Sequence, residues 1–333
     1  MWSPLTGKKS EPRRVQTEFL TAYYEYPASA FSGTVVETEE KRSYVRRQIE
    51  VPLSFPPALV LENLEELKKE VAEIEKNDRK KARDMKLRYT NRIDFYVPKD
   101  IPAGEKRPFI LISPILGGNM VVDRFAAYYA GRGYIAAIVH RKKPYLSETP
   151  GDLSGIEDYM RTSVLRLRQA IDWAVQQPEV DPERIGAFGI SYGAILHTVL
   201  AAVEPRVKYH ILAMPAGGIA EIIMEVPEKP IQKLVRQTRE EFGWSDEKIY
   251  SELKAHIQTD PLYFAPFADR NRVEVYVALF DQVVGAGNTW ELWRELGRPS
   301  LKILPFGHYG GVLVFPFLQT QSYLSFKKHL NSK

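Results

Sequence analysis

The chain of 333 residues is 44% hydrophobic and 26% charged, a composition typical of globular proteins. Its length is sufficient for a large buried core, in one α/β domain or in two smaller ones. The 46 Lys and Arg residues nearly balance the 42 Asp and Glu residues, and the net charge of +4 argues against nucleic-acid binding. Cysteine is absent, which excludes disulfides, thiolate metal sites and cysteine nucleophiles.

Neither the start of the chain nor its longest uncharged run predicts membrane insertion. Residues 1–9 contain no apolar stretch of the kind that forms the core of a signal peptide. Residues 303–326 carry no Lys, Arg, Asp or Glu and are long enough to span a bilayer. Prolines, glycines and His308 interrupt this run, so we interpret it as a strand, a loop and a helix. No membrane span is therefore expected.

Residues 1–90 are predicted to form an N-terminal extension that carries one long helix. Residues 1–40 show no clear period, and we expect them to wrap over the surface, whereas 44–55 alternate loosely and predict a first strand. The segment 58–87 predicts an amphipathic helix, because apolar side chains recur at helical spacing at Val60, Leu64, Leu67, Val71 and Ile74. We expect it to pack against its own domain. A helix-mediated dimer or a mobile flap is less favoured, since the stripe lasts only about two heptads.

Residues 91–333 are predicted to form a unit of the α/β class. Apolar runs typical of strands alternate with amphipathic runs, which favours a mostly parallel sheet with helices on both faces. Residues 92–98 are interpreted as an edge strand, and the alternation breaks between about 215 and 269, where helical stretches rich in charge and aromatics occur. We interpret that segment as a cap inserted between two core strands. Further strands are expected at 109–113, 134–139, 184–190, 207–213, 273–280 and 301–304, and helices at 119–131, 155–177, 289–296 and the C-terminus.

One short stretch of this unit carries a pattern with chemical meaning. Gly189-Ile190-Ser191-Tyr192-Gly193 lies between an apolar run and an apolar helix-like segment, which is the G-x-S-x-G nucleophile-elbow pattern. The two glycines permit a crowded, strained turn that exposes the Ser191 hydroxyl. Chance gives about 0.1 such matches in a chain of this length. The alternative is a serine in an ordinary glycine-rich turn, so the motif depends on its surroundings for support.

An acid and a histidine follow the serine in the order that this architecture requires. A serine hydroxyl is a weak nucleophile unless a base takes its proton, and the base needs a partner that fixes its tautomer. Asp281 comes directly after the run 273–280, and His308 follows the next strand in a glycine-rich segment. Both lie at the C-terminal ends of predicted parallel strands, where open α/β sheets place their sites. We therefore predict a catalytic triad of Ser191, His308 and Asp281.

Other acids and histidines are weaker candidates. Asp281 could simply cap a turn, and His308 could be an ordinary loop histidine. Asp260 and Asp269 compete with Asp281, but they precede its strand and are expected to point away from the site. His140 is a reserve candidate for the base, because it ends an earlier strand. By default, packing or surface roles are expected for all of the other histidines: His140, His197, His210, His256 and His329.

The negative charge that develops on a substrate carbonyl needs two backbone donors. In the elbow architecture these are the amide after the nucleophile, here Tyr192, and one from the loop after an early strand. We expect that loop at 113–119, where two glycines let the backbone approach a substrate, with Leu116 as the donor and Gly117 as the alternative. The segment could also be an ordinary turn with Asn119 as helix N-cap, and both descriptions can hold together.

These motifs resemble the α/β-hydrolase superfamily over about residues 107–330. The phrase Asp-Pro-Glu-Arg-Ile-Gly-Ala-Phe-Gly-Ile-Ser-Tyr-Gly-Ala at 181–194 is similar to that of dienelactone hydrolases and prolyl-oligopeptidase-like esterases. The resemblance implies an eight-stranded sheet, acyl transfer without a metal, a cap after the sixth strand, and a catalytic domain at 91–333. The family's usual His-Gly at the oxyanion loop is replaced by Pro114-Ile115, so the resemblance does not identify the second donor. Residues 1–90 carry no such resemblance.

Together these patterns predict a serine hydrolase, most simply a carboxylesterase, that acts on small ester or acyl substrates through an acyl-enzyme. Large apolar side chains between 215 and 269 favour an apolar acyl pocket. Acyl transfer, thioester cleavage or peptide cleavage on the same triad stays open, as does a non-catalytic binding module that uses the 58–87 helix. No phosphate loop, dinucleotide fingerprint or zinc-binding spacing occurs, so no cofactor or metal is expected. The oligomeric state and the compartment are left open.

Overall fold

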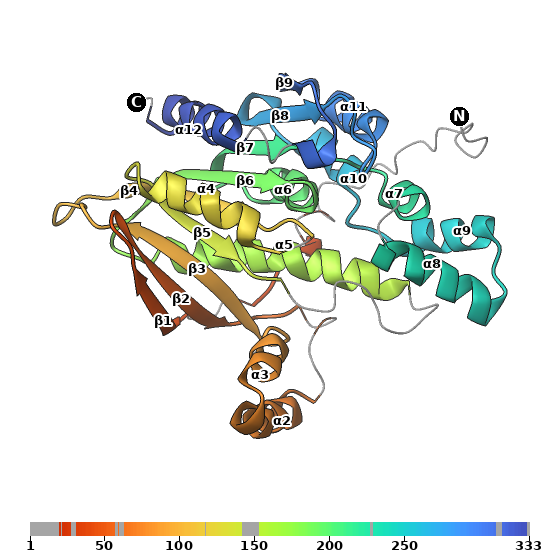
Figure 1. The fold of residues 1–333 in the computed structure, drawn as a ribbon, viewed down its shortest axis with the longest axis horizontal. Coiled ribbons are helices and arrows are strands. Elements are labelled where there is room, and N and C mark those ends of the chain that lie inside the picture. The colour runs from red at the N-terminus through yellow and green to blue at the C-terminus, as the bar shows by residue number, and fades with distance from the viewer. Residues whose placement is uncertain are drawn as a thin grey trace.

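The computed structural model describes residues 20, 22–27, 31–56, 59, 63–116, 118–141, 153–226, 229–310 and 315–331. Within these residues a nine-stranded sheet runs through the molecule, with helices on both of its faces (Figure 1). Along the sheet the strands lie in the order β1-β2-β3-β5-β4-β6-β7-β8-β9. Their bounds are β1 (Thr34–Glu40), β2 (Tyr44–Pro52), β3 (Thr90–Pro98), β4 (Arg107–Ser113), β5 (Ile135–Val139), β6 (Val180–Ile190), β7 (Val207–Ala213), β8 (Val273–Ala278) and β9 (Ser300–Leu304).

Most of the sheet is parallel, which confirms the predicted fold class. β5, β4, β6, β7, β8 and β9 run parallel to one another, whereas β1, β2 and β3 continue the sheet as antiparallel strands beside β5. The sheet has nine strands rather than the eight that the resemblance implied. β1 has no counterpart in the sequence prediction, because its side chains are almost all exposed and show no alternation of burial.

The prediction of an edge strand at 92–98 is wrong, because β3 lies between β2 and β5. Nearly all of its side chains are buried. Two of them are charged, Arg92 and Asp94, and each pairs with an opposite charge on β2. Glu50 accepts from Arg92 at 2.8 Å, and Arg46 donates to Asp94 at the same distance. This pairing lets a strand with ionic side chains occupy the interior of the sheet.

Helices cover both faces of the sheet. α5 and α6 pack against one face, and α4 and α12 pack against the other. The helices expected near 119–131 and 155–177 and at the C-terminus correspond to α4, α5 and α12. The described helices are α2 (Leu64–Asn77), α3 (Arg79–Lys86), α4 (Met120–Ala130), α5 (Ser154–Ala174), α6 (Tyr192–Val203), α7 (Ile219–Glu225), α8 (Lys229–Phe242), α9 (Asp246–His256), α10 (Pro261–Phe264), α11 (Ala286–Glu295) and α12 (Phe315–Asn331), with 3₁₀ turns at Ala265–Phe267 and Arg270–Arg272.

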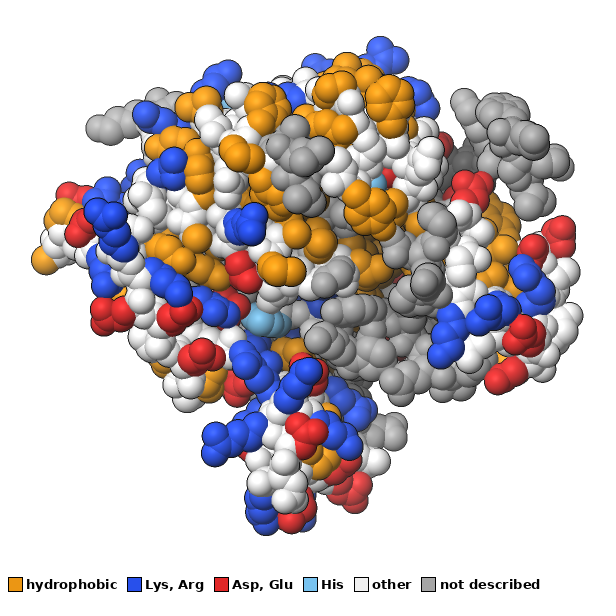
Figure 2. All heavy atoms as spheres, viewed as in Figure 1, with side chains coloured by type: hydrophobic (Ala, Val, Ile, Leu, Met, Phe, Trp, Pro, Cys, Tyr) orange, Lys and Arg blue, Asp and Glu red, His pale blue; other side chains and the backbone are white. Residues whose placement is uncertain are grey.

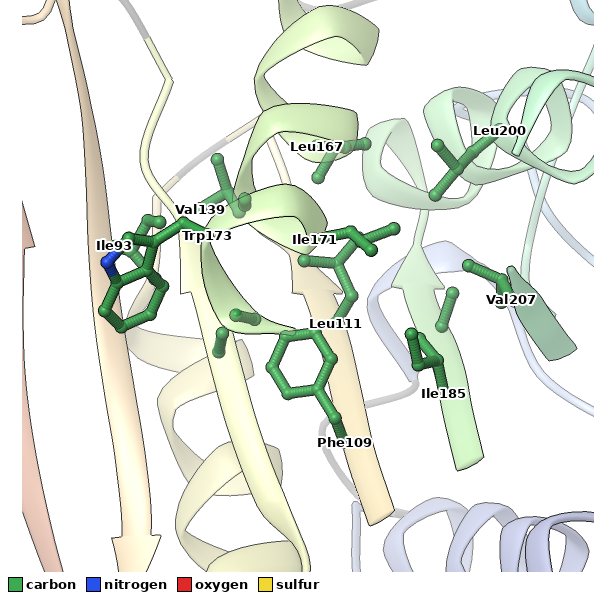
Figure 3. Close-up of a cluster of buried hydrophobic side chains, with 14 of the residues drawn as sticks. Ile93, Phe109, Leu111, Val139, Leu167, Ile171, Trp173, Ile185, Leu200 and Val207 are labelled. Atoms are coloured by element: carbon green, nitrogen blue, oxygen red, sulfur yellow. The ribbon is translucent and has the colours of Figure 1, made fainter. Parts of the chain in front are cut away.

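The core on the α5 side holds the central strands in place (Figure 3). Leu167 of α5 and Leu200 of α6 are buried in one cluster with Phe109 of β4 and Ile185 of β6. Trp173 of α5 extends the cluster toward β3. The buried parts of β4 and β6, residues 109–112 and 185–190, are apolar on both faces, as expected of a parallel sheet covered on both sides. Close packing of this kind fixes the strands whose ends carry the site.

The segment predicted as one helix at 58–87 contains two helices, α2 and α3. The break occurs at Asp78, whose carboxylate accepts the backbone N–H of Lys81 at 2.9 Å and so caps α3. Leu67 and Val71 of α2 bury against Ala82 of α3, so the apolar stripe forms a small core within the helix pair itself. The pair projects from the body of the protein, and its outer surface is densely charged (Figures 1 and 2). Residues 58 and 60–62 lie outside the described residues.

The helix pair is inserted between two adjacent antiparallel strands. Pro52 at the end of β2 is the register partner of Thr90 at the start of β3. The amide of Leu53 donates to the carbonyl of Tyr89 at 3.0 Å. β2 also contributes Ile49 to the core on the α5 side. The division of the chain at residue 90 into an extension and a catalytic domain stays a prediction, although β1 and β2 belong to the same sheet as the later strands.

Between β7 and β8 the chain forms α7, α8, α9 and α10, in the segment predicted as a cap. Residues of α7, α8 and α9 share an apolar cluster with Ile156 and Met160 of α5. The role of this segment as a cap stays a prediction. No described helix combines the length and the apolarity needed to cross a bilayer.

We predict that Val71→Asp opens the helix pair without unfolding the rest of the protein. The substitution places a carboxylate in a cluster that contains only residues of the pair and the adjoining Tyr89. Hydrogen exchange and trypsin cleavage within 64–86 should increase strongly, whereas the main thermal midpoint should change by less than about 2 °C. Ala72→Asp is the matched control, because Ala72 is exposed on the same helix. Equal protection of Val71→Asp and Ala72→Asp against hydrogen exchange and trypsin would contradict a separate core within the helix pair.

Candidate active site

Three strand ends bring the predicted triad residues to one edge of the sheet. Ser191 directly follows β6, Asp281 lies in the loop after β8, and His308 lies in the loop after β9. All three strands belong to the parallel part of the sheet, and β8 and β9 are neighbours. Their C-terminal ends therefore lie at the same edge, which is where open α/β sheets bind ligands.

The turn at Ser191 has the strained backbone that the motif predicts. Ser191 has φ 53° and ψ −124°, a conformation that side chains rarely adopt. A Cβ at Gly189 would lie 2.5 Å from the backbone carbonyl of Gly193, and a Cβ at Gly193 would lie 2.6 Å from the carbonyl oxygen of Ser113. Both positions therefore require glycine. The close contacts press the start of α6 against the ends of β6 and β4.

The acid and the histidine are hydrogen-bonded to each other. Nδ1 of His308 lies 2.8 Å from Oδ2 of Asp281. The other carboxylate oxygen of Asp281 accepts the amides of Val283 at 2.9 Å and Val284 at 3.1 Å. The Asp281 side chain is almost fully buried, and that of His308 is 11% exposed. A carboxylate held in this way fixes the ring and leaves Nε2 of His308 able to accept a proton.

Backbone contacts extend the pairing of β8 and β9 into the two loops. The amide of Leu279 donates to the carbonyl of Leu304 at 3.0 Å, and the amide of Phe280 donates to the carbonyl of Phe306 at 3.2 Å. A Cβ at Gly307 would lie 2.8 Å from the carbonyl oxygen of Phe280. The loops that carry the acid and the histidine are thus held together beyond the strands. In the described part of the chain, no hydrogen bond joins the Ser191 hydroxyl to His308. The distance between a nucleophile and its base is often longer when no ligand is bound.

The two predicted oxyanion donors lie on neighbouring elements. Tyr192 is the first residue of α6, and the first amides of a helix have no partner within it. Leu116 lies in a tight turn that the amide of Gly118 closes by donating to the carbonyl of Ile115 at 3.1 Å. The alternative donor, Gly117, lies outside the described residues. Arg141 connects the two elements, because its guanidinium donates to the Ile115 carbonyl and lies 5.1 Å from the centre of the Tyr192 ring.

The competing acids have structural roles. Asp260 is buried and accepts the amides of Gly218 at 2.9 Å and Ile219 at 2.7 Å, so it links the start of α7 to α10. Asp269 accepts the amide of Asn271 at 2.9 Å and caps a 3₁₀ turn. Neither contacts His308 in the described part of the chain.

Four of the five other histidines are packing or surface residues. His197 is buried and lies 2.6 Å from the Ser113 hydroxyl, and burial lowers its pKa well below the usual range. Burial also lowers the pKa of His210, to about 3, so it stays neutral within β7. His256 is exposed on α9, and His329 stacks on Tyr209 with the ring centres 3.8 Å apart.

The reserve candidate His140 forms a second Asp–His pair that the sequence analysis missed. Its Nε2 lies 2.8 Å from Asp94, and its ring also meets the amide of Asn119 at 3.2 Å. Asp94 accepts from Arg46 and Gln48 as well. Burial raises the pKa of Asp94, but hydrogen bonds from His140 and the charge of Arg46 outweigh this and hold it below its usual value. No local signal reveals the pair, because Asp94 lies on β3 and His140 follows β5.

Comparison with solved structures identifies the architecture. Acetyl xylan esterase from Paenibacillus sp. R4 is similar with a TM-score of 0.69 and 14% identity over 97% of each chain. Acetyl xylan esterase 1 from Thermoanaerobacterium sp. JW/SL YS485 is similar with a TM-score of 0.62 and 16% identity, over 91% of this chain and 93% of that one. The chain has the α/β-hydrolase fold. A cold-adapted esterase from an Arctic intertidal metagenomic library shares this hydrolase fold with a TM-score of 0.54 and 15% identity, over 91% of this chain and 100% of that one.

Sequence comparison points to the same fold for part of the chain. The family model of the X-Pro dipeptidyl-peptidase (S15 family) matches residues 62–226, just under half of the chain. The matched segment includes Ser191 but neither Asp281 nor His308, and it reaches back into the N-terminal region. None of the curated proteins matches the sequence. The described residues contain no group of three or more His, Asp or Glu side chains that could hold a metal ion.

We predict that Gly189→Ala destabilises this hydrolase fold by about 2 kcal/mol or more, because the new methyl group would overlap the backbone of the Ser191 turn. Gly287→Ala is the matched control. Gly287 lies in α11, and nothing lies within 4 Å of its Cβ position, so alanine there should be neutral or slightly stabilising. Denaturant unfolding of both variants measures the difference. Equal stabilities would show that the turn relaxes without strain.

Proposed function

We propose that this α/β-hydrolase-fold protein is a serine hydrolase that cleaves carboxylic esters. The observation that carries the proposal is the 2.8 Å hydrogen bond between His308 and Asp281, at the sheet edge where Ser191 occupies a strained turn. A serine, a histidine and an acid in this chain order on parallel strand ends are typical of nucleophilic acyl transfer. The esterase names of the structurally similar proteins point to the same class of reaction.

In the proposed reaction the Ser191 hydroxyl attacks the acyl carbon while Nε2 of His308 takes its proton. Asp281 keeps the ring in the required tautomer and stabilises the imidazolium that forms. The amides of Tyr192 and Leu116 stabilise the oxyanion, and the positive end of the α6 dipole adds to this effect. His308 then protonates the leaving alcohol, and in the second step it activates the water that releases the acid from Ser191.

The side chains around these groups favour an apolar acyl portion of the substrate. Leu116 of the oxyanion turn and Ile195 of α6 belong to, or pack against, the apolar cluster that the α7–α9 helices form. Val283 and Val284, whose amides hold Asp281, belong to or pack against the same cluster. The proposed cap therefore meets the nucleophile helix, the oxyanion turn and the acid loop through one apolar surface. A short or medium acyl chain suits such a surface better than a charged group does.

A peptidase is the second candidate, because the matched family model describes an X-Pro dipeptidyl-peptidase. Such a substrate brings a charged amino terminus and an amine leaving group. The apolar cluster beside the proposed site favours the ester over this substrate. Acyl transfer to an alcohol and cleavage of thioesters would use the same residues, whereas a binding module would not need the His308–Asp281 pair.

We predict that Ser191→Ala and His308→Gln each lower hydrolysis of p-nitrophenyl acetate by a factor of about 10³ or more, because each removes a member of the triad. His140→Gln is the matched control. It removes the Asp94–His140 pair, and the variant should retain activity within about threefold of the unmodified protein. Steady-state kinetics and labelling by a fluorophosphonate probe give independent readouts. Full activity of Ser191→Ala would show that another residue is the nucleophile. Loss of activity in His140→Gln alone would show that His308 is not the base.

We further predict that kcat/KM for p-nitrophenyl acetate or butyrate exceeds that for Ala-Pro p-nitroanilide by about 100-fold or more, because the apolar cluster binds an acyl chain and not an ammonium group. The comparison is made with one enzyme preparation. Product analysis with added methanol separates acyl transfer from hydrolysis. A preference for the anilide would replace the esterase proposal by the peptidase.

A further inference from the structure

The segment that contains α7, α8 and α9 is closed at its base by a buried carboxylate. These helices lie together beside the start of α5 (Figure 1), and they share an apolar cluster with Ile156 and Met160 of that helix. Where the segment begins, the amides of Gly218 and Ile219 donate to Asp260, at 2.9 and 2.7 Å, and Asp260 lies just beyond the end of the segment. Asp260 therefore joins the two ends of the segment to each other.

A second buried carboxylate, that of Glu157, joins the returning end of this segment to α5. The Glu157 side chain accepts four hydrogen bonds from described residues, and the residue is 7% exposed. Three of the donors directly precede Asp260. They are the amide of Gln258 at 2.8 Å, the amide of Thr259 at 2.7 Å and the hydroxyl of Thr259 at 2.6 Å. Several donors to one buried carboxylate hold it firmly, so the position of Thr259 depends on Glu157.

The N-terminal segment 22–27 supplies the remaining contacts to this junction. The fourth donor to Glu157 is the hydroxyl of Tyr23, at 2.7 Å. The hydroxyl of Tyr24 lies 2.8 Å from that of Thr259, and both residues are fully buried. Thr259 has one hydroxyl proton, which it gives to Glu157, so Tyr24 is the donor in this second bond. Residues far apart in the sequence thus meet at one buried polar cluster.

The same N-terminal segment is fixed along the length of α5. The guanidinium of Arg161 donates to the carbonyl of Tyr23 at 2.8 Å and lies 3.8 Å from the centre of its ring. The hydroxyl of Tyr26 donates to Asp172, near the other end of the helix. The segment therefore connects the body of the protein to the base of the α7–α9 helices.

We propose that Glu157 and the segment 22–27 determine which acyl chains this protein accepts, because through Thr259 they set the position of the α7–α9 helices. The inference rests on the proposed ester cleavage and its apolar acyl surface. The α7–α9 helices share their apolar cluster with Ile195, which lies on the helix that follows the nucleophile. A displacement of these helices changes the room beside Ser191 for an acyl chain. Glu157 is a positioning residue, since it acts through Thr259 and not on the substrate.

Hydrogen exchange tests the positioning without reference to activity. Tyr23→Phe and Tyr24→Phe each remove a single oxygen, so the fold should be kept while a hydrogen bond to Glu157 or Thr259 is lost. Exchange of the amides of α7, α8 and α9 should become faster by a factor of about 5 in each variant. Tyr26→Phe is the matched control, because it removes a hydroxyl of the same segment that binds Asp172 instead, and exchange should stay within about twofold.

Steady-state kinetics test the effect on acyl selection. In Tyr23→Phe and Tyr24→Phe, kcat/KM for p-nitrophenyl octanoate relative to p-nitrophenyl acetate should rise by about threefold or more, because less constrained helices leave room for a longer chain. The rise should come from a lower KM for the octanoate. The kcat for the acetate and labelling by a fluorophosphonate probe should not change, since the proposed triad is untouched. Tyr26→Phe should keep the original ratio.

The outcomes separate this inference from the proposed function. Unchanged exchange of α7–α9 in both Tyr23→Phe and Tyr24→Phe would overturn the inference and leave the proposed esterase in place. Faster exchange with an unchanged ratio of the two esters would also overturn it, because the helices would then move without affecting the acyl chain. If the unmodified protein hydrolysed neither ester, the proposed ester cleavage would fail, and the role in acyl selection would fail with it.

Discussion

The close approach of the Ser191 turn to the end of β4 is the contact on which the rest of the site depends. Gly193 leaves no room for a side chain against the Ser113 carbonyl, so α6 begins directly beside the end of β4. A second contact holds the same two elements together, since His197 of α6 lies 2.6 Å from the Ser113 hydroxyl in the buried interior. His197 is neutral there, so this link involves no buried charge. Two short contacts thus define the distance between Ser191 and the loop that follows β4.

The two Asp–His pairs, Asp94–His140 and Asp281–His308, differ in which groups balance the charge of the carboxylate. Asp94 receives the guanidinium of Arg46 as well as His140, so its charge is already neutralised when the histidine is neutral. Asp281 receives two backbone amides and His308, and no Lys or Arg among the described residues pairs with it. Its negative charge therefore remains available to stabilise a protonated His308. This difference in charge balance, rather than hydrogen-bond length, favours His308 as the base.

The sequence was sufficient to predict the elements that follow strong local patterns. The apolar runs at β4, β5 and β7 and the G-x-S-x-G turn each depend on a few consecutive residues, and Asp281 and His308 each stand directly after such a run. β1 was missed because its side chains face solvent, and the interior position of β3 depends on salt bridges to β2 that no local pattern shows. The break at Asp78 was missed because good helix formers such as Arg, Lys, Ala and Met follow it, although the aspartate caps a new helix. The Asp94–His140 pair and the hydrogen bonds to Glu157 depend entirely on tertiary contacts.

The register of β2 and β3 has a consequence for how this protein can vary. Pro52 and Thr90 face each other across the strand pair, so the chain leaves the sheet and returns to it at the same point. The pairing of β2 with β3 holds the two ends of this insertion together. Lengthening a loop whose ends are fixed costs little conformational entropy. Insertions or deletions within the α2–α3 pair would leave the register of every strand unchanged. The projecting pair is therefore a natural position for grafting a tag, a reporter or a targeting module onto this scaffold.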